Sequence, residues 1–270
     1  MLKQRVLSAL VFVPIFFGLA YLGGVVFDVF LVLILLIAGL EYVRMMKKGG
    51  YQVSTFLMLA AIVALLLCQI LGAGDIIIHI LVALLAVFGV YALVKFEQDD
   101  KQAFQSLAIQ FFGIFFIGIL GGTAISLNHI DPHGNFWMLA SIALVWLVDT
   151  GAYFIGSRFG KTAVLPKLSP KKSLEGFFGG LGFGGVFGYL IGLIVQSFMP
   201  ELSPLKGAIF GLSMGFVAFF GDALMSLLKR TMNVKDTGSI LPGHGGILDR
   251  LDSMLWAFAL GLLFATTSLF

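Results

Sequence analysis

Long apolar runs recur along the whole chain, and they constrain its fold more than any other feature. A helix needs about 20 mainly apolar residues to cross a bilayer. About nine runs approach this length, separated by short polar segments: 6–22, 25–40, 56–71, 76–94, 104–127, 136–155, 177–198, 205–228 and 254–269. Only helices and closed barrels satisfy their own backbone hydrogen bonds in lipid. We therefore predict an all-α polytopic integral membrane protein with about nine transmembrane helices.

Composition excludes several other classes of protein. The chain is 59% hydrophobic and only 11% charged, whereas a soluble domain is about 25% charged. The net charge of +3 is too small for a nucleic-acid-binding surface. A single cysteine, Cys68, excludes an internal disulfide and any metal site built from several cysteines.

The basic residues predict how the chain crosses the membrane. If the N-terminus is cytoplasmic, all of the 17 Lys and Arg residues except Lys206 fall on the cytoplasmic side. Cytoplasmic segments of membrane proteins carry this positive excess. We predict a cytoplasmic N-terminus and a C-terminus outside. The first apolar run shows no cleavage pattern of a signal peptide and is expected to stay as a span.

Polar residues divide the chain into two regions. Residues 1–102, with spans one to four, hold little that suggests chemistry. Their carboxylates Asp28 and Glu41 lie near span ends and are expected to be solvated or at headgroup level. Residues 103–270 form the predicted catalytic region, with cytoplasmic loops at 156–176 and 229–252. The glycine-rich stretch 179–185 lacks the Lys-Ser/Thr ending of a phosphate loop, so we predict close helix packing there.

Two carboxylates of the second region lie inside predicted spans. Asp149 and Asp222 are each near a cytoplasmic span end. A carboxylate in a span is costly unless it faces a partner or a wet cavity. We predict a polar cavity that both residues line, open to the cytoplasm and sideways to lipid.

The segment 226–252 is the most informative part of the chain. It mixes Lys and Arg, which bind phosphates, with carboxylates suited to Mg²⁺ and glycines that permit sharp turns. Asp249 and Asp252 are spaced to share one helical face. His244 has no other His or Cys nearby, so we expect hydrogen bonding or loop positioning and no zinc site.

This segment resembles the signature of the phosphatidate cytidylyltransferases: Ser-x-hydrophobic-Lys-Arg, then Lys-Asp, Pro-x-His-Gly-Gly and Asp-Arg-x-Asp. Residues 149–153, 156–161 and 169–176 also resemble that family. The resemblance implies that CTP and phosphatidic acid give CDP-diacylglycerol and pyrophosphate for phospholipid biosynthesis. Mg²⁺ is the implied cofactor, and the number of metal ions stays open.

The resemblance also implies roles for residues of this chain. Asp222 and Asp249 would bind the metal. The catalytic set would be Asp222, Lys229, Arg230, Lys235, Asp236, His244, Asp249, Arg250 and Asp252. The substrate-binding set would be Asp149, Ser169, Lys171, Lys172, Glu175, Gly245 and Gly246.

The implied setting is the plasma membrane of a prokaryote, with the active site facing the cytoplasm. The partners would be CTP, phosphatidic acid and the bilayer, without nucleic acid, and a homo-oligomer stays open. Two alternatives remain at this point: a CTP-dependent polyprenol kinase, which would release CDP, and an ion-coupled transporter, which would place charges near the midplane.

Overall fold

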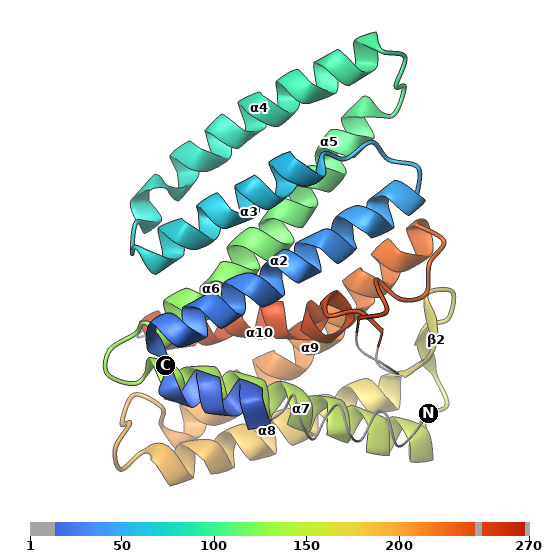
Figure 1. Ribbon diagram of the computed structural model, residues 1–270. Coiled ribbons are helices and arrows are strands. Elements are labelled where there is room, and N and C mark those ends of the chain that lie inside the picture. The colour runs from blue at the N-terminus through green and yellow to red at the C-terminus, as the bar shows by residue number, and fades with distance from the viewer. Residues whose placement is uncertain (1–13, 241–244, 268–270) are drawn as a thin grey trace. The chain divides into compact units, whose positions relative to one another are not determined.

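The computed structural model describes residues 14–240 and 245–267, which are mostly helical (Figure 1). The helices are α2 (Gly24–Lys48), α3 (Thr55–Ile70), α4 (Ile77–Glu97), α5 (Ala103–Gly113), α6 (Leu120–Asn128), α7 (Gly134–Phe159), α8 (Leu174–Val195), α9 (Pro204–Thr231) and α10 (Leu248–Thr266). A 3₁₀ turn, η1 (Gly74–Ile76), precedes α4, and a π-helical segment, η2 (Ile114–Ile119), joins α5 to α6. Residues 14–22 are also helical.

The described helices coincide with the predicted apolar runs. Among them, 6 are long and apolar enough to cross a membrane: Gly24–Lys48, Gly74–Glu97, Ala103–Asn128, Gly134–Phe159, Leu174–Val195 and Pro204–Thr231. The prediction of an all-α membrane protein is confirmed at this level. Several helices extend past their apolar run, because hydropathy marks only the part suited to hydrocarbon. For example, α2 continues beyond residue 40 to Lys48.

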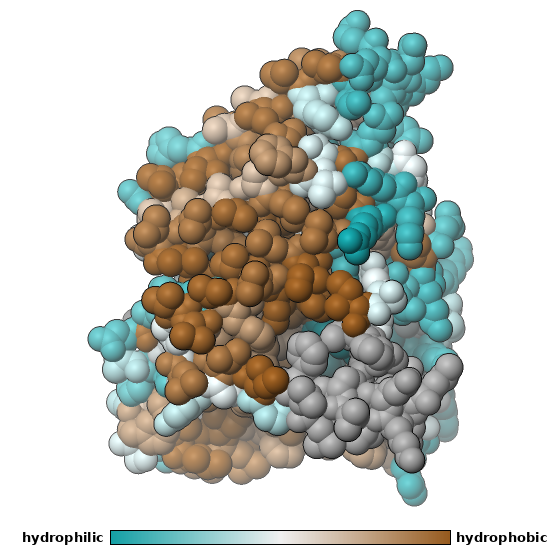
Figure 2. Space-filling model, in the orientation of Figure 1, coloured by the Kyte–Doolittle hydropathy of each residue, from teal (hydrophilic) through white to brown (hydrophobic). Residues whose placement is uncertain are grey.

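The chain forms two compact units. Unit 1 contains the described residues of 1–19, 23–126 and 229–250, and unit 2 those of 20–22, 127–228 and 251–270. In unit 1, α2 packs on α3, and α4 packs on α5 (Figure 1). Hydrophobic side chains cover the sides of these helices (Figure 2). Hydrophilic side chains gather at the turns that connect α2 to α3 and α4 to α5 (Figure 2).

Polar contacts inside unit 1 fix how its helices meet. The Ser54 hydroxyl caps α3 by accepting a hydrogen bond from the Leu57 N–H at 3.3 Å. The Ser54 N–H in turn donates to the buried Gln110 side chain on α5 at 2.9 Å. The Tyr42 hydroxyl on α2 donates to the Ile109 carbonyl at 2.8 Å. These bonds satisfy polar groups that would otherwise be costly to bury.

A stripe of glycines determines the packing in unit 2. Every fourth residue on the buried face of α8 is a glycine, from Gly176 to Gly192. A Cβ on Gly184 would overlap the carbonyl of Gly211 on α9, and a Cβ on Gly188 would overlap that of Gly207. The predicted close packing is confirmed, since backbones approach to this distance only where side chains are absent.

The glycine stripe gives a matched pair of variants within α8. Gly184→Ala forces α8 and α9 apart and should destabilise the protein by about 1–3 kcal/mol, the usual cost of overpacking. Gly182→Ala meets open space and should be neutral or slightly stabilising, because alanine favours helix over glycine. Thermal unfolding in detergent measures both. Equal melting temperatures for the two variants would contradict the packing argument.

Lys206, the one basic residue expected outside, is buried in unit 2. Its ammonium donates to the Thr267 carbonyl at 3.2 Å and lies 5.6 Å from the centre of the Trp137 ring. A cation that binds a carbonyl group at the C-terminal end of α10 stabilises that helix. Its position therefore has a packing reason separate from the charge asymmetry of the loops.

Candidate active site

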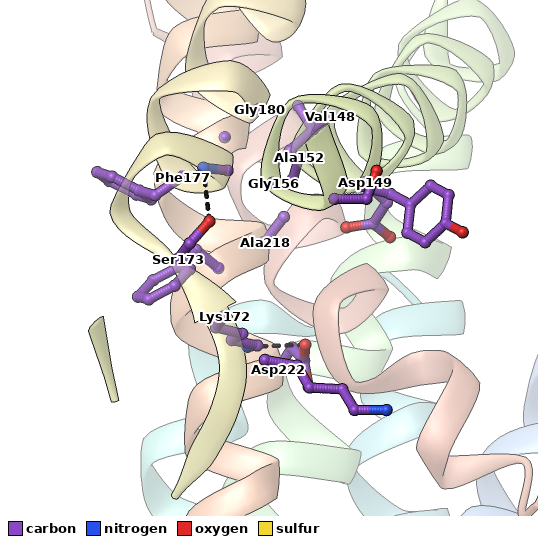
Figure 3. Close-up of a pocket in the computed structure, with 16 residues that line it drawn as sticks. Val148, Asp149, Ala152, Gly156, Lys172, Ser173, Phe177, Gly180, Ala218 and Asp222 are labelled. Carbon is purple, nitrogen blue, oxygen red and sulfur yellow. Dashed lines mark hydrogen bonds and ion pairs between the residues drawn. The ribbon is translucent and has the colours of Figure 1, made fainter. Parts of the chain in front are cut away.

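A cavity of about 470 Å³ opens among α7, α8 and α9 of unit 2 (Figure 3). Its size falls in the usual range for ligand pockets. Four predicted site residues line it: Asp149, Lys171, Lys172 and Asp222. The structure therefore brings both intramembrane carboxylates to one cavity, as the sequence predicted.

The lysines reach this cavity from a short hairpin. Strands β1 (Ala163–Leu165) and β2 (Ser169–Ser173) pair antiparallel, and β2 leads directly into α8. The Ser173 hydroxyl caps α8 by accepting from the Gly176 N–H at 3.1 Å. The Glu175 carboxylate accepts from the Lys161 N–H at 3.0 Å. Glu175 is thus engaged in holding the hairpin, and neither it nor Ser169 lines the cavity.

Lys172 and Asp222 form the polar centre of the cavity. The ammonium lies 2.7 Å from the carboxylate of Asp222, whose side chain is 44% exposed (Figure 3). The Ser226 hydroxyl contacts the other carboxylate oxygen at 3.4 Å. The Lys172 ammonium is itself buried, with the Asp222 carboxylate and the Phe219 ring beside it. A buried ammonium left without an anion is costly, so this position suits a ligand phosphate that takes the place of Asp222.

Unit 1 contains the second group of predicted residues, around Asp249 in the first turn of α10. The Lys229 ammonium lies 2.6 Å from one oxygen of Asp249. The other oxygen accepts from the Thr237 N–H at 2.8 Å, the Thr237 hydroxyl at 3.0 Å and the Gly246 N–H at 3.0 Å. This carboxylate therefore fixes both ends of the loop between α9 and α10.

The electrostatics of Asp249 follow from these contacts. Burial by itself raises the pKa of the Asp249 carboxyl. The hydrogen bond from Lys229, the two backbone N–H bonds and the Lys229 charge outweigh burial, so the pKa lies below its ordinary value. Asp249 is therefore ionised at neutral pH.

Glu41 is a component of this region that the sequence analysis missed. It was expected to be solvated or at headgroup level, and that expectation is wrong, because Glu41 is 1% exposed. Its carboxylate accepts from the Ile247 N–H at 3.1 Å and the Leu248 N–H at 2.9 Å, and it lies 3.3 Å from the Thr237 hydroxyl, whose one proton it shares with the closer Asp249. Asp28 is buried as well. Glu41 thus binds the free N–H groups at the start of α10.

The glycines near Glu41 are explained by its position. A Cβ on Gly238 or Gly246 would overlap the Glu41 carboxylate. Gly245 has a φ of +84°, a conformation that favours glycine. A carboxylate in an apolar helix and glycines in a polar loop were both visible in the sequence, but nothing in it linked them.

The remaining predicted residues lie in both units. Asp252 is buried in the second turn of α10, in unit 2. In unit 1, four predicted residues are exposed: Arg230, Lys235, Asp236 and Arg250. His244 lies outside the described residues. Asp222 and Asp249 belong to different units, so their predicted joint role in metal binding stays a prediction.

Comparison with known proteins places the chain in a family. The cytidylyltransferase family matches residues 3–268. A phosphatidate cytidylyltransferase of Bacillus subtilis is 30% identical, over 100% of this chain and 98% of its own. One of Staphylococcus epidermidis is 31% identical over 96% and 97%, and one of Synechocystis is 29% identical over 94% and 92%. A match over nearly the full length shows that this chain belongs to the cytidylyltransferase family.

Proposed function

We propose that this protein transfers a cytidylyl group from CTP to phosphatidic acid, giving CDP-diacylglycerol and pyrophosphate. The observation that carries the proposal is the full-length similarity to phosphatidate cytidylyltransferases. In this reaction a phosphate oxygen of phosphatidic acid attacks the α-phosphorus of CTP. The bond from that phosphorus to the bridging oxygen breaks, and pyrophosphate leaves. Because an anion approaches a polyanion, catalysis requires positioning and charge neutralisation.

The cavity of unit 2 supports this chemistry. Lys171 and Lys172 supply positive charge for a phosphate, which would replace Asp222 as the anion beside the buried Lys172 ammonium. The lysines bind and orient the phosphate, and Phe177 and Phe219 form part of the apolar wall of the cavity. The proposed partners of the remaining substrate phosphate groups are four cations of unit 1: Lys229, Arg230, Lys235 and Arg250.

Mg²⁺ is the proposed cofactor, which when bound would neutralise phosphate charge and stabilise the leaving pyrophosphate. Asp222 and Asp149 both line the cavity of unit 2 and are the carboxylates there that could hold such an ion, and Asp222 would have to release Lys172 to do so. Within residues 14–240 and 245–267 no three His, Cys, Asp or Glu side chains converge for a metal. Asp249 has both oxygens occupied by donors, so an ion there requires Lys229 to move away.

The proposed setting is the plasma membrane of a bacterium, crossed by nine helices with the N-terminus inside and the C-terminus outside. Residues 103–270 would contain the catalytic region, completed by Glu41 from the N-terminal part. The active site would face the cytoplasm, where CTP is dissolved, while the acyl chains of phosphatidic acid stay in the bilayer. The charge asymmetry of the loops supports this orientation.

Differently labelled CTP tests the proposed reaction. Purified protein is incubated with Mg²⁺, CTP labelled at either the α- or the γ-phosphate, and micelles that contain both phosphatidic acid and a polyprenol. We expect α-label in the lipid product and γ-label in released pyrophosphate. Transfer of γ-label to a polyprenol, with CDP as the second product, would instead identify a kinase. Absence of any labelled lipid would refute both activities.

A further inference from the structure

A second cavity lies in unit 1, between the end of α2 and the loop that follows α9. Its volume is about 570 Å³, within the range of ligand pockets. It is lined by residues from two segments: Glu41, Arg44, Lys47 and Lys48 on α2, and residues 236–240 of the loop. We refer to it as the α2 cavity.

Two contacts hold the loop along α2 on either side of these cations. At one end, a Cβ on Gly49 would overlap the Met232 sulfur, so the loop begins against the end of α2. At the other end, the buried Glu41 lies 3.3 Å from the Thr237 hydroxyl and packs against Gly238. Arg44, Lys47 and Lys48 occupy the turns between these anchors. The described part of the loop is therefore held against α2 at two points, one at each end of this run of cations.

Positive charge dominates the part of the α2 cavity that a ligand can reach. Three cations face two carboxylates, and Glu41 already has both oxygens occupied by donors from the loop and α10. Arg44, Lys47 and Lys48 are exposed, and none of them forms an ion pair within residues 14–240 and 245–267. The Lys47 ammonium donates to the Thr55 hydroxyl at 2.8 Å, a neutral partner that leaves its charge unpaired. Their charge is thus available to an anion.

Charge asymmetry between loops requires only that cations lie on the cytoplasmic side, on any face of the helix. Arg44 and Lys48 follow Glu41 by three and seven residues, so all three share the helix face that meets the loop. This placement is specific to the cavity, and a role in topology alone does not require it.

We propose that the α2 cavity binds a phosphate group of a substrate, held by Arg44 and Lys48 with Lys47 beside them. Arginine can bind a phosphate through two parallel N–H bonds. The phosphate comes either from the triphosphate of the nucleotide or from the headgroup of the lipid substrate. The proposal rests on the cytidylyl transfer proposed above and adds a substrate contact from the N-terminal part of the chain.

Steady-state kinetics with three variants test the α2 cavity. Arg44→Gln combined with Lys48→Gln should raise the apparent KM for one substrate by about tenfold or more, because bonds to charged groups are strong. A higher KM for CTP identifies the nucleotide as the source, and a higher KM for phosphatidic acid identifies the lipid. Arg44→Lys keeps the positive charge at this position but loses the paired N–H groups, so it should raise the same KM by less than the double variant does. Lys95→Gln, at the end of α4 and outside the cavity, is the matched control and should change neither KM.

Two outcomes separate this inference from the proposed function. If the wild type is active and the double variant leaves both KM values unchanged, the cations only set topology and the inference is wrong. If the wild type makes no CDP-diacylglycerol, titration with inorganic pyrophosphate replaces the kinetics. Weaker pyrophosphate binding by the double variant than by the wild type and Lys95→Gln would then support the α2 cavity, and equal binding would overturn it.

Discussion

The Asp222→Asn variant is expected to lose about 10²–10³-fold in kcat while still inserting into the membrane. That magnitude is typical when one group that stabilises developing charge is removed. Asparagine has nearly the shape of aspartate but carries no charge, so it can neither pair with Lys172 nor bind Mg²⁺ as a carboxylate does. The measurement is turnover of CTP in phosphatidic acid micelles, with Asp75→Asn, an exposed carboxylate in η1, as the control.

A second variant distinguishes two roles of Asp222. If Asp222 binds Mg²⁺, Asp222→Asn should also raise the Mg²⁺ concentration needed for half-maximal rate. If Asp222 only positions Lys172, adding Asp222→Asn to Lys172→Ala should cause no further loss. Lys172→Ala alone should raise the apparent KM for CTP or phosphatidic acid. Near-normal turnover of Asp222→Asn would remove this residue from the active site.

The Glu41→Gln variant should lower kcat/KM by about 10–100-fold, although Glu41 lies in a region where the sequence indicated little chemistry. The glutamine side chain has an NH₂ group in place of one carboxylate oxygen, so one backbone N–H that bonded to that oxygen loses its acceptor. An unsatisfied buried donor costs about 1–3 kcal/mol. The negative charge at the start of α10 is also lost. The loop would then no longer be held against α2.

Hydrogen exchange separates this positioning role from general destabilisation. The Ile247 and Leu248 amides bond to Glu41 and should exchange faster in Glu41→Gln, while amides in α7 and α8 keep their protection. Glu97→Gln, at the exposed end of α4, is the matched control. Unchanged exchange at residues 247 and 248, together with unchanged kcat/KM, would show that Glu41 does not position the loop.

Hydropathy and residue pattern were enough to predict the helices and the general place of the chemistry. In hydrocarbon the backbone must satisfy its own hydrogen bonds, so each long apolar run predicts a helix almost without regard to context. The glycine repeat of α8 similarly predicted close packing, because its spacing is local. Asp149 and Asp222 were predicted to line a cavity, since a carboxylate is costly in lipid.

The polar groups that contact one another could be identified only from the packing of the helices. Glu41 and Thr237 are separated by 196 residues, and the same carboxylate at a helix end can be solvated or buried without any change in local pattern. The pairing of Lys172 with Asp222 and the placement of Arg44 beside the loop also join distant segments. Such contacts depend on how the helices pack. Periodicity and hydropathy report each segment's own environment and not its partner, so the sequence alone could not reveal them.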